Sequence, residues 1–112
     1  MYETGKSQAV QPLFNMDKKG VKNDEQKNRL ELVPPSLMLA AGRVLTYGAV
    51  KYAPDNWRFV DDSIRRYRGA LLRHLMAYLS GESLDDESGL PHLWHVAANV
   101  AFLIELEGDY DM

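Results

Sequence analysis

The sequence contains no cysteine, so neither a disulfide framework nor a thiolate metal site is available to the fold. It has no excess of positive charge, and its net charge of −3 argues against a main role in binding duplex nucleic acid. The longest apolar run, VAANVAFLI, is too short to cross a bilayer, and the N-terminus shows no signal peptide. We therefore expect a cytoplasmic protein that does not enter membranes.

Three common signatures are also missing: a glycine-rich P-loop, a nucleophile elbow and a dinucleotide-binding fingerprint. The composition is nevertheless that of a globular protein, with 46% hydrophobic and 26% charged residues. The 112 residues suit one domain with a modest core. Because a helical domain this small often completes its core by oligomerising, we expect a homodimer or a homotetramer.

Apolar residues recur at helical spacing in three segments, which predicts an all-α fold, a small bundle of three main helices. The first helix follows Ser36 as its N-cap and ends before Pro54. The second begins at residues 61–63 and stops at Gly81, and the third is capped by Ser88. The expected core faces are Ile64, Leu71, Leu75 and Leu79 on the second helix, and Leu90, Leu93, Ala97, Val100, Ala101 and Ile104 on the third.

The segment before these helices has a different character. Residues 1–28 are polar and show no period, so we interpret them as an N-terminal arm that is mostly non-helical. Residues 29–112 then form the helical domain. Apolar and polar residues alternate at 30–33, which predicts a short extended piece that the following prolines close.

The stretch GESLDDESGLPHLWH, residues 81–95, combines an acidic turn with two histidines. Its carboxylates are Glu82, Asp85, Asp86 and Glu87, and its histidines are His92 and His95. On the helices, His74 and Asn99 belong to rows with three-and-four spacing, and each row projects to one side. If the second and third helices pack antiparallel, we expect His74, His95 and Asn99 to meet in one cleft, with the acidic turn at its mouth.

Each of these residues also has a simpler explanation. A lone histidine at a helix interface is more often a satisfied core residue than a ligand, and an acidic turn before a helix often serves as a cap. We prefer these explanations for any single residue, but not for the whole constellation, because buried polar groups must be paired. Three histidines, one asparagine and four carboxylates within 26 positions therefore indicate a functional site.

A second candidate site lies in GAVKYAPDNWRF. The segment supplies a flat aromatic ring, an amide and two cations at a helix end, and it holds Lys51, Tyr52, Asn56, Trp57 and Arg58. Such groups can stack on a base and pair with a phosphate. Anchoring of a loop to the core explains Trp57 equally well. Arg73 is a further cation that can reach inward, whereas Lys27 and Arg29 in the arm are best explained by a solvated charge pair.

The chain resembles the N-terminal domain of phage dATP/dGTP diphosphohydrolases in three stretches: KNRLELVPP, LTYGAVKYAPDNW and LLRHLMAYLSGESLDDESGLPHLWHVAANVAFLIELE. The likeness runs from Lys27 to Glu107, and its long spaced pattern makes it specific. The resemblance implies a phage or prophage protein, acting in the cytoplasm of the infected bacterial host, whose helical domain binds purine nucleotides. Carried over by position, the implied site residues are Lys27, Arg29, Lys51, Tyr52, Asn56, Trp57, Arg73, His74, Glu82, Asp85, Glu87, His92, His95 and Asn99.

Two functions remain open at this point. An enzyme would release pyrophosphate from purine deoxynucleoside triphosphates, with Glu82, Asp85 and Glu87 as catalytic carboxylates and Mg²⁺ or Mn²⁺ as cofactor. Its metal ligands would be Glu82, Asp85, His92 and His95. A binder would need no cofactor and would sequester a purine nucleotide, such as a cyclic oligonucleotide immune signal, without turnover.

Sequestration is the function that the sequence favours slightly. The resembling architecture can carry a second, catalytic domain, and this chain ends at Met112. The carboxylates crowd into one turn, while the helical rows carry mostly histidine, asparagine and small residues, and imidazole suits Zn²⁺ or Mn²⁺ better than Mg²⁺. A purely structural module would leave the polar rows unexplained, so we rank it last.

Overall fold

The computed structural model describes residues 20–22, 25 and 27–108. The chain divides into two compact units, and the boundary lies between Pro34 and Pro35. Most of the expected N-terminal arm lies outside the described residues, and the expected boundary at residue 29 falls within the first unit.

The described end of the first unit is a short helical turn. A 3₁₀-helix, η1, spans Leu30–Leu32, so the predicted extended piece is wrong. The backbone N–H groups of Leu32 and Val33 each donate to a carbonyl three residues back, at 3.1 Å. A four-residue alternation with no partner strand in the described part of the chain satisfies its backbone groups locally in this way.

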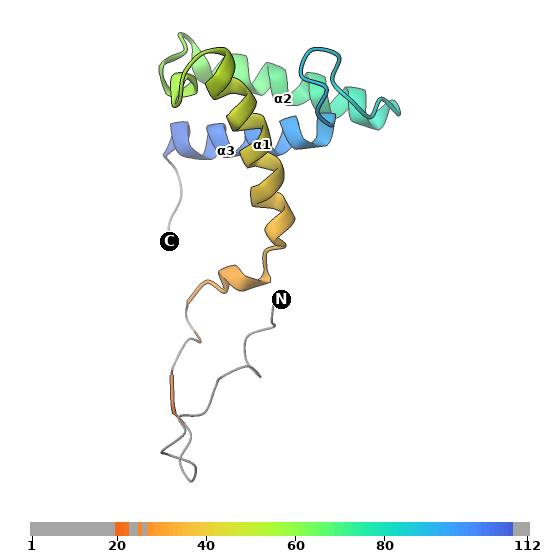
Figure 1. Ribbon diagram of the computed structural model, residues 1–112. Helices are drawn as coiled ribbons and strands as arrows, with labels where there is room; N and C mark the ends of the chain where they lie inside the picture. Colours follow the sequence, from red (N-terminus) through yellow and green to blue (C-terminus); the bar gives the residue numbers. More distant parts are fainter. Residues whose placement is uncertain (1–19, 23–24, 26, 109–112) are drawn as a thin grey trace. The chain divides into compact units, whose positions relative to one another are not determined.

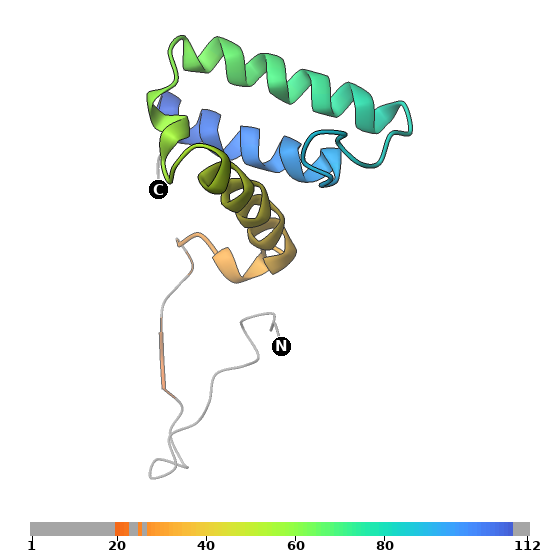
Figure 2. The ribbon, with the colours of Figure 1, turned by 45° about the horizontal axis from the view of Figure 1, so that its top comes forward.

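The prediction of an all-α fold is confirmed. The second unit holds α1 (Pro35–Lys51), the 3₁₀-helix η2 (Asn56–Phe59), α2 (Ser63–Leu79) and α3 (His92–Glu107). Helices α2 and α3 run antiparallel side by side, and α1 crosses them (Figures 1 and 2). Helix α3 is central, because it packs against both α1 and α2. None of the helices in the described part of the chain has the length and apolar character that a membrane crossing needs.

The ends of α1 and α2 lie within a few residues of their predicted positions. Helix α1 begins at Pro35, whose fixed φ suits a first helical turn, so Ser36 lies inside the helix. Asp62 is the N-cap of α2, but its carboxylate accepts a bond from Arg65 at 2.6 Å and caps no backbone group. Gly81, one of the predicted stops, follows α2 with a φ of 94°, a conformation that glycine adopts without strain.

The start of α3 differs from the prediction. The helix begins at His92 with Pro91 as its N-cap, so Ser88 is not the cap. A residue before proline is disfavoured in the helical conformation, so α3 does not extend through Leu90 back to Ser88. The loop instead closes through an isolated bridge between Leu84 and Pro91.

Helix α3 also packs with the opposite face from the one predicted. The row expected in the core is largely exposed: Leu93, Val100 and Ile104 show 45%, 40% and 53% of their surface. The buried residues of the helix are His92, Ala98 and Asn99. Both rows have helical spacing, so periodicity identifies the helix but does not decide which row faces α2.

The hydrophobic core of the second unit is small. Among the described residues, the buried hydrophobic side chains are Val44 of α1 and Ala98 of α3. Large apolar side chains stay exposed on every helix, including Leu79, which was expected in the core. An apolar surface of this kind is typical of a chain that packs against another protein surface.

Candidate functional site

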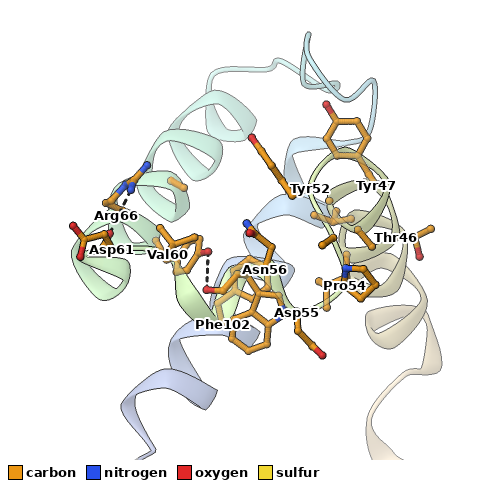
Figure 3. A pocket seen from close by; sticks show the side chains of 18 of the residues that line it. Thr46, Tyr47, Tyr52, Pro54, Asp55, Asn56, Val60, Asp61, Arg66 and Phe102 are labelled. Atoms are coloured by element: carbon orange, nitrogen blue, oxygen red, sulfur yellow. Dashed lines mark hydrogen bonds between the residues drawn. The ribbon is translucent and has the colours of Figure 1, made fainter.

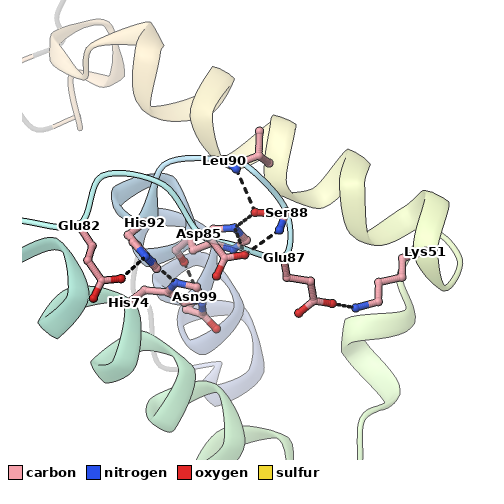
Figure 4. Close-up of polar contacts among 10 residues, drawn as sticks. Lys51, His74, Glu82, Asp85, Glu87, Ser88, Leu90, His92 and Asn99 are labelled. Atoms are coloured by element: carbon pink, nitrogen blue, oxygen red, sulfur yellow. Dashed lines mark hydrogen bonds and ion pairs between the residues drawn. The ribbon is translucent and has the colours of Figure 1, made fainter.

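The three histidines of the chain converge between α2 and the start of α3, and Figure 4 shows His74 and His92 side by side. His74 Nδ1 lies 2.8 Å from His92 Nδ1, a distance at which one ring donates a proton and the other accepts it. The His74 ring also stacks on His95, with centroids 4.3 Å apart and planes inclined by 9°. The antiparallel packing expected from the sequence therefore does bring His74 and His95 together.

The acidic loop between α2 and α3, residues 80–91, folds over this group. Asp85 Oδ2 accepts the backbone N–H of Ser88 at 2.8 Å and lies 4.0 Å from His95 Nε2. The Ser88 hydroxyl lies 2.7 Å from the same His95 nitrogen. On the other side, Glu82 Oε1 lies 3.6 Å from His92 Nε2. Each histidine of α3 thus has a carboxylate of the loop beside it.

Burial sets the charge of these groups. Desolvation, followed by the nearby His95, lowers the pKa of His74, and desolvation also lowers the pKa of His95. For Asp85, partial burial alone would raise the pKa, but the hydrogen bonds from Ser88 outweigh it and the net pKa is lowered. At neutral pH these two imidazoles are therefore uncharged and face an ionised carboxylate.

One group in the described part of the chain has the spacing of a metal site: His74, Asp85 and His92, whose donor atoms lie within 4.8 Å of one another. The ligand set expected from the sequence contained Glu82 and His95 and not His74. The structure places those two residues beside the group, as neighbours of His92 and Asp85.

The third predicted catalytic carboxylate lies elsewhere. Glu87 pairs with Lys51 at the end of α1 and points away from the histidines (Figure 4). The hydrogen bond from Lys51 to Glu87 raises the pKa of the ammonium, so Lys51 stays charged. The carboxylates of Glu82, Asp85 and Glu87 therefore have three different partners, and the described residues do not gather them into an all-carboxylate site.

A separate pocket of about 930 Å³ lies between α1, the following loop and α2 (Figure 3). Tyr52 extends from the α1 side toward α2 (Figure 3). The polar and aromatic residues that line the pocket include Tyr47, Tyr52, Asn56, Trp57, Arg65, Arg66, Tyr67 and Arg73. Four residues predicted from the sequence, Tyr52, Asn56, Trp57 and Arg73, thus come together here, apart from the histidines.

Within this pocket, Trp57 already has aromatic and cationic partners. Its ring stacks on Phe102 with centroids 4.7 Å apart, and the Arg58 guanidinium lies 4.4 Å from its centroid. The Tyr67 hydroxyl donates to the Trp57 carbonyl at 3.0 Å. These contacts match the loop-anchoring explanation. Tyr52 is 63% exposed, and the Lys51 ammonium lies 5.2 Å from the centroid of its ring.

The arginines of the pocket differ in their contacts. Arg65 binds Asp62, and Arg66 donates to the Asp61 carbonyl at 3.3 Å. Arg73 is exposed and, among the described residues, makes no hydrogen bond or ion pair. It is therefore the cation that can meet a phosphate without breaking an existing contact.

Three other predicted residues are neither members of the group of His74, Asp85 and His92 nor lining residues of the pocket. Asn99 is buried, and its amide donates to the His95 carbonyl of its own helix at 2.8 Å. Lys27 and Arg29 belong to the first unit, where Arg29 Nε pairs with Glu31 at 2.9 Å. This exposed pair matches the solvated charge pair preferred on the residues alone.

The comparison with known families matches residues 17–112 to the family described as dATP/dGTP diphosphohydrolase, N-terminal. The chain belongs to this family. A relative named dATP/dGTP diphosphohydrolase, from Salmonella phage PMBT28, is 34% identical over 87 residues, which cover 78% of this chain. The same residues cover 29% of the relative, so the chain spans less than a third of its length. No solved structure matches the chain.

The family match spans both the histidine group and the pocket. Sequence reasoning missed Ser88 as a partner of His95, and Tyr47 and Arg66 as pocket residues. Arg66 and Arg73 are seven positions apart and so share one helix face, which is a signal that helical spacing could have provided. Ser88 carried no such signal, because a serine before a helix reads as a cap.

Proposed function

We propose that the chain binds a purine deoxynucleoside triphosphate and takes part in its hydrolysis to the monophosphate and pyrophosphate. The observation that carries this proposal is membership of the diphosphohydrolase family, supported by the name of the phage relative. These comparisons favour hydrolysis over the sequestration preferred from the sequence. The relative is more than three times as long as the shared segment, so its activity is a proposal for this chain.

The pocket between α1 and α2 is the proposed nucleotide site. Its volume of about 930 Å³ is in the range of small-molecule pockets, which is roughly 300–1,000 Å³. Tyr52 offers an exposed ring on which a purine can stack, and Asn56 offers an amide for the edge of the base. Arg73 is the available cation for the phosphates.

The reaction that we propose replaces one phosphorus–oxygen bond by another. Water attacks the α-phosphorus and releases a proton to solvent, the bond to the bridging oxygen of the β-phosphate breaks, and pyrophosphate leaves with the bonding electron pair. Arg73 and Lys51 stabilise the charge that develops on the phosphate oxygens. Lys51 is the last residue of α1, and its pair with Glu87 links the end of this helix to the acidic loop.

A divalent ion held by carboxylates of the acidic loop would offset phosphate charge and lower the pKa of a bound water. Mg²⁺ and Mn²⁺ are the ions that we expect for this chemistry. The residues available to hold it are Asp85 and its neighbours on the loop, with ionised Asp85 already oriented by Ser88. The lowered pKa of Asp85 keeps this carboxylate ionised at neutral pH.

Sequestration without turnover is a second candidate. The observation that favours it is the separate engagement of Glu82, Asp85 and Glu87, which leaves no preformed all-carboxylate site in the described residues. A held ligand, including a cyclic oligonucleotide, would use the same Tyr52 and Arg73 contacts. It would need no metal.

The fate of the nucleotide separates the two candidates. We would incubate the chain with dATP, dGTP, dCTP or cyclic purine dinucleotides, with Mn²⁺ or EDTA, then denature it by heat and separate the released molecules by chromatography. Monophosphate and pyrophosphate from dATP or dGTP, dependent on Mn²⁺, are the expected products. Intact nucleotide released only on heating would support sequestration and contradict hydrolysis. A nucleotide that is neither retained nor changed would contradict both candidate functions.

A further inference from the structure

The His–Asp cluster, which we define as His74, Asp85 and His92, gathers donor atoms from three elements (Figure 4). His74 lies on α2, Asp85 lies in the acidic loop, and His92 is the first residue of α3. The donor atoms lie within 4.8 Å of one another, and the two Nδ1 atoms lie 2.8 Å apart. Anything bound by all three side chains would join both helices and the loop.

His92 is the buried member of this cluster and has an unused polar atom. Its side chain is 8% exposed, and its Nε2 has no hydrogen-bond partner among the described residues. A buried nitrogen without a partner is unfavourable by roughly 1–3 kcal/mol, so such an atom calls for an explanation. The nearest carboxylate, Glu82 Oε1, lies 3.6 Å away, just beyond hydrogen-bond distance.

A bound metal ion would explain both the unpartnered Nε2 of His92 and the close approach of its Nδ1 to His74. If His92 Nδ1 binds a cation, the ring proton must sit on Nε2, where it faces Glu82. Histidine ligands of metals commonly donate their second N–H to a carboxylate in this way, and the carboxylate fixes the tautomer. The unpartnered nitrogen and the short Nδ1–Nδ1 contact then have one cause.

We propose that the His–Asp cluster binds a divalent transition-metal ion, with Zn²⁺ preferred over Mg²⁺, through His74 Nδ1, His92 Nδ1 and the Asp85 carboxylate. Imidazole nitrogen is a ligand that Zn²⁺ and similar ions favour, whereas Mg²⁺ prefers oxygen ligands and retains its water. Two histidines with one carboxylate are a known zinc set that leaves a fourth position for water or a substrate oxygen.

The geometry requires only a small movement. Two nitrogens on one tetrahedral Zn²⁺ lie roughly 3.3 Å apart, because each bond is about 2.0 Å long. The Nδ1 atoms therefore separate by about half an ångström from their present 2.8 Å when the ion enters. Movement of His92 Nε2 toward Glu82 at the same time would close a distance of 3.6 Å to a hydrogen bond.

The neighbours of the cluster already hold its members in position. Ser88 donates its backbone N–H to Asp85 at 2.8 Å, which orients the carboxylate. His95 stacks on His74 and fixes the plane of that ring, while the Ser88 hydroxyl occupies His95 Nε2 at 2.7 Å. His95 is thereby engaged outside the ligand set, which explains why the sequence-based set of ligands differs from the proposed one.

This metal site shares Asp85 with the proposed hydrolysis, but it is measured without nucleotide, so either proposal can fail while the other stands. The full chain would be stripped with EDTA, dialysed, and titrated with Zn²⁺ and with Mg²⁺ by calorimetry. We expect one Zn²⁺ per chain and an affinity at least about a hundredfold higher than for Mg²⁺. Co²⁺ should give visible absorption bands of a histidine-ligated ion, and Zn²⁺ should displace them.

Matched variants assign the ligands. Asp85→Asn and His74→Gln should each weaken Zn²⁺ binding at least about tenfold, and Glu82→Gln should weaken it about tenfold through His92. Asp86→Asn, the exposed neighbour outside the cluster, should bind Zn²⁺ as the wild type does. Circular dichroism of each variant checks that α2 and α3 remain folded.

Several results would overturn the site. They are absence of Zn²⁺ binding to the wild type, equal affinity for Zn²⁺ and Mg²⁺, or an Asp86→Asn loss equal to that of Asp85→Asn. The Co²⁺ spectrum of the wild type needs no variant, so it still tests the site if a variant does not fold. Loss of the metal site alone would leave the nucleotide proposal standing, because chromatography tests that proposal separately.

Discussion

His74 of α2 and His95 of α3 stack in nearly parallel planes, with ring centroids 4.3 Å apart. The stack joins the middle of one helix to the first turns of the other, directly beneath the acidic loop. Two imidazoles in this arrangement repel each other when both are protonated, and burial opposes the charge on either. The stack therefore makes the fold sensitive to pH below neutrality.

In metal-free buffer, the stability of the chain should fall as the pH falls below about 6.5. The pKa of His74 and of His95 is lowered in the folded chain, chiefly by burial, so the unfolded chain binds more protons in this range. The stability that these two uncharged histidines contribute is complete above the pKa of histidine in the unfolded chain. It is lost as the pH falls toward their lowered pKa values in the folded chain. Of the groups that face the stack, His92 and Arg73 add to this loss, whereas Asp85 and Glu87 oppose it.

Urea unfolding midpoints measured between pH 8 and pH 5 check this prediction. His74→Gln, which removes one ring of the stack, should flatten the dependence between pH 7 and pH 5. A midpoint that stays constant for the wild type through this range would show that neither histidine resists protonation in the fold.

Trp57→Ala should destabilise the second unit by about 3 kcal/mol, the lower end of the range for large aromatic residues. Trp57 is half-buried and loses its contacts with Phe102 and Arg58. Denaturant unfolding measures the change. Phe59→Ala is the matched control, because Phe59 is 82% exposed and should change stability by no more than about 0.5 kcal/mol. Equal effects of the two substitutions would remove the loop-anchoring role of Trp57.

Tyr52→Ala should weaken nucleotide binding without unfolding the chain. The exposed ring provides stacking worth about 1–3 kcal/mol per base, while its removal opens no buried cavity. Fluorescence titration with a labelled purine nucleotide gives the affinity. Tyr78→Ala, an exposed tyrosine of α2 that does not line the pocket, should bind as the wild type does. An unchanged affinity in Tyr52→Ala would place the base elsewhere.

We propose that exposed apolar residues of α3 are covered by a second copy of the chain. Only Val44 and Ala98 are buried hydrophobic residues among those described, so a lone helical unit has little core. Sedimentation equilibrium at micromolar concentration should give a dimer or a tetramer. Ile104→Glu should shift it toward the monomer, since Ile104 is 53% exposed on that face. A monomeric wild type would contradict the proposal that a second copy of the chain covers this face.

The fold was predictable where local chemistry determines it. Helical spacing, Ser36, Pro54 and Gly81 place α1 and α2 to within a few residues. The start of α3 was misplaced because Ser88 resembles an N-cap, whereas Pro91 excludes the residue before it from the helix. The packed face of α3 depends on tertiary contacts, and its two rows are both compatible with helical periodicity.

The site was predictable as a set of residues and less so as an arrangement. The convergence of His74 with His95 followed from antiparallel packing, and Tyr52 and Arg73 do share a pocket. Separation of that pocket from the histidines could not be seen in the sequence, because it depends on where α1 crosses. The orientation of Glu87 toward Lys51 likewise depends on a contact between residues 36 positions apart.

The most direct test of the central claim is calorimetric titration of dGTP into the wild-type chain and two arginine variants. The account predicts saturable binding to the wild type and to Arg68→Ala, whose guanidinium pairs with Glu107 outside the pocket. Arg73→Ala should bind at least about tenfold more weakly, because it loses a charged contact to phosphate. No binding to the wild type, or equal binding to both variants, would contradict the claim that this pocket holds a purine nucleotide.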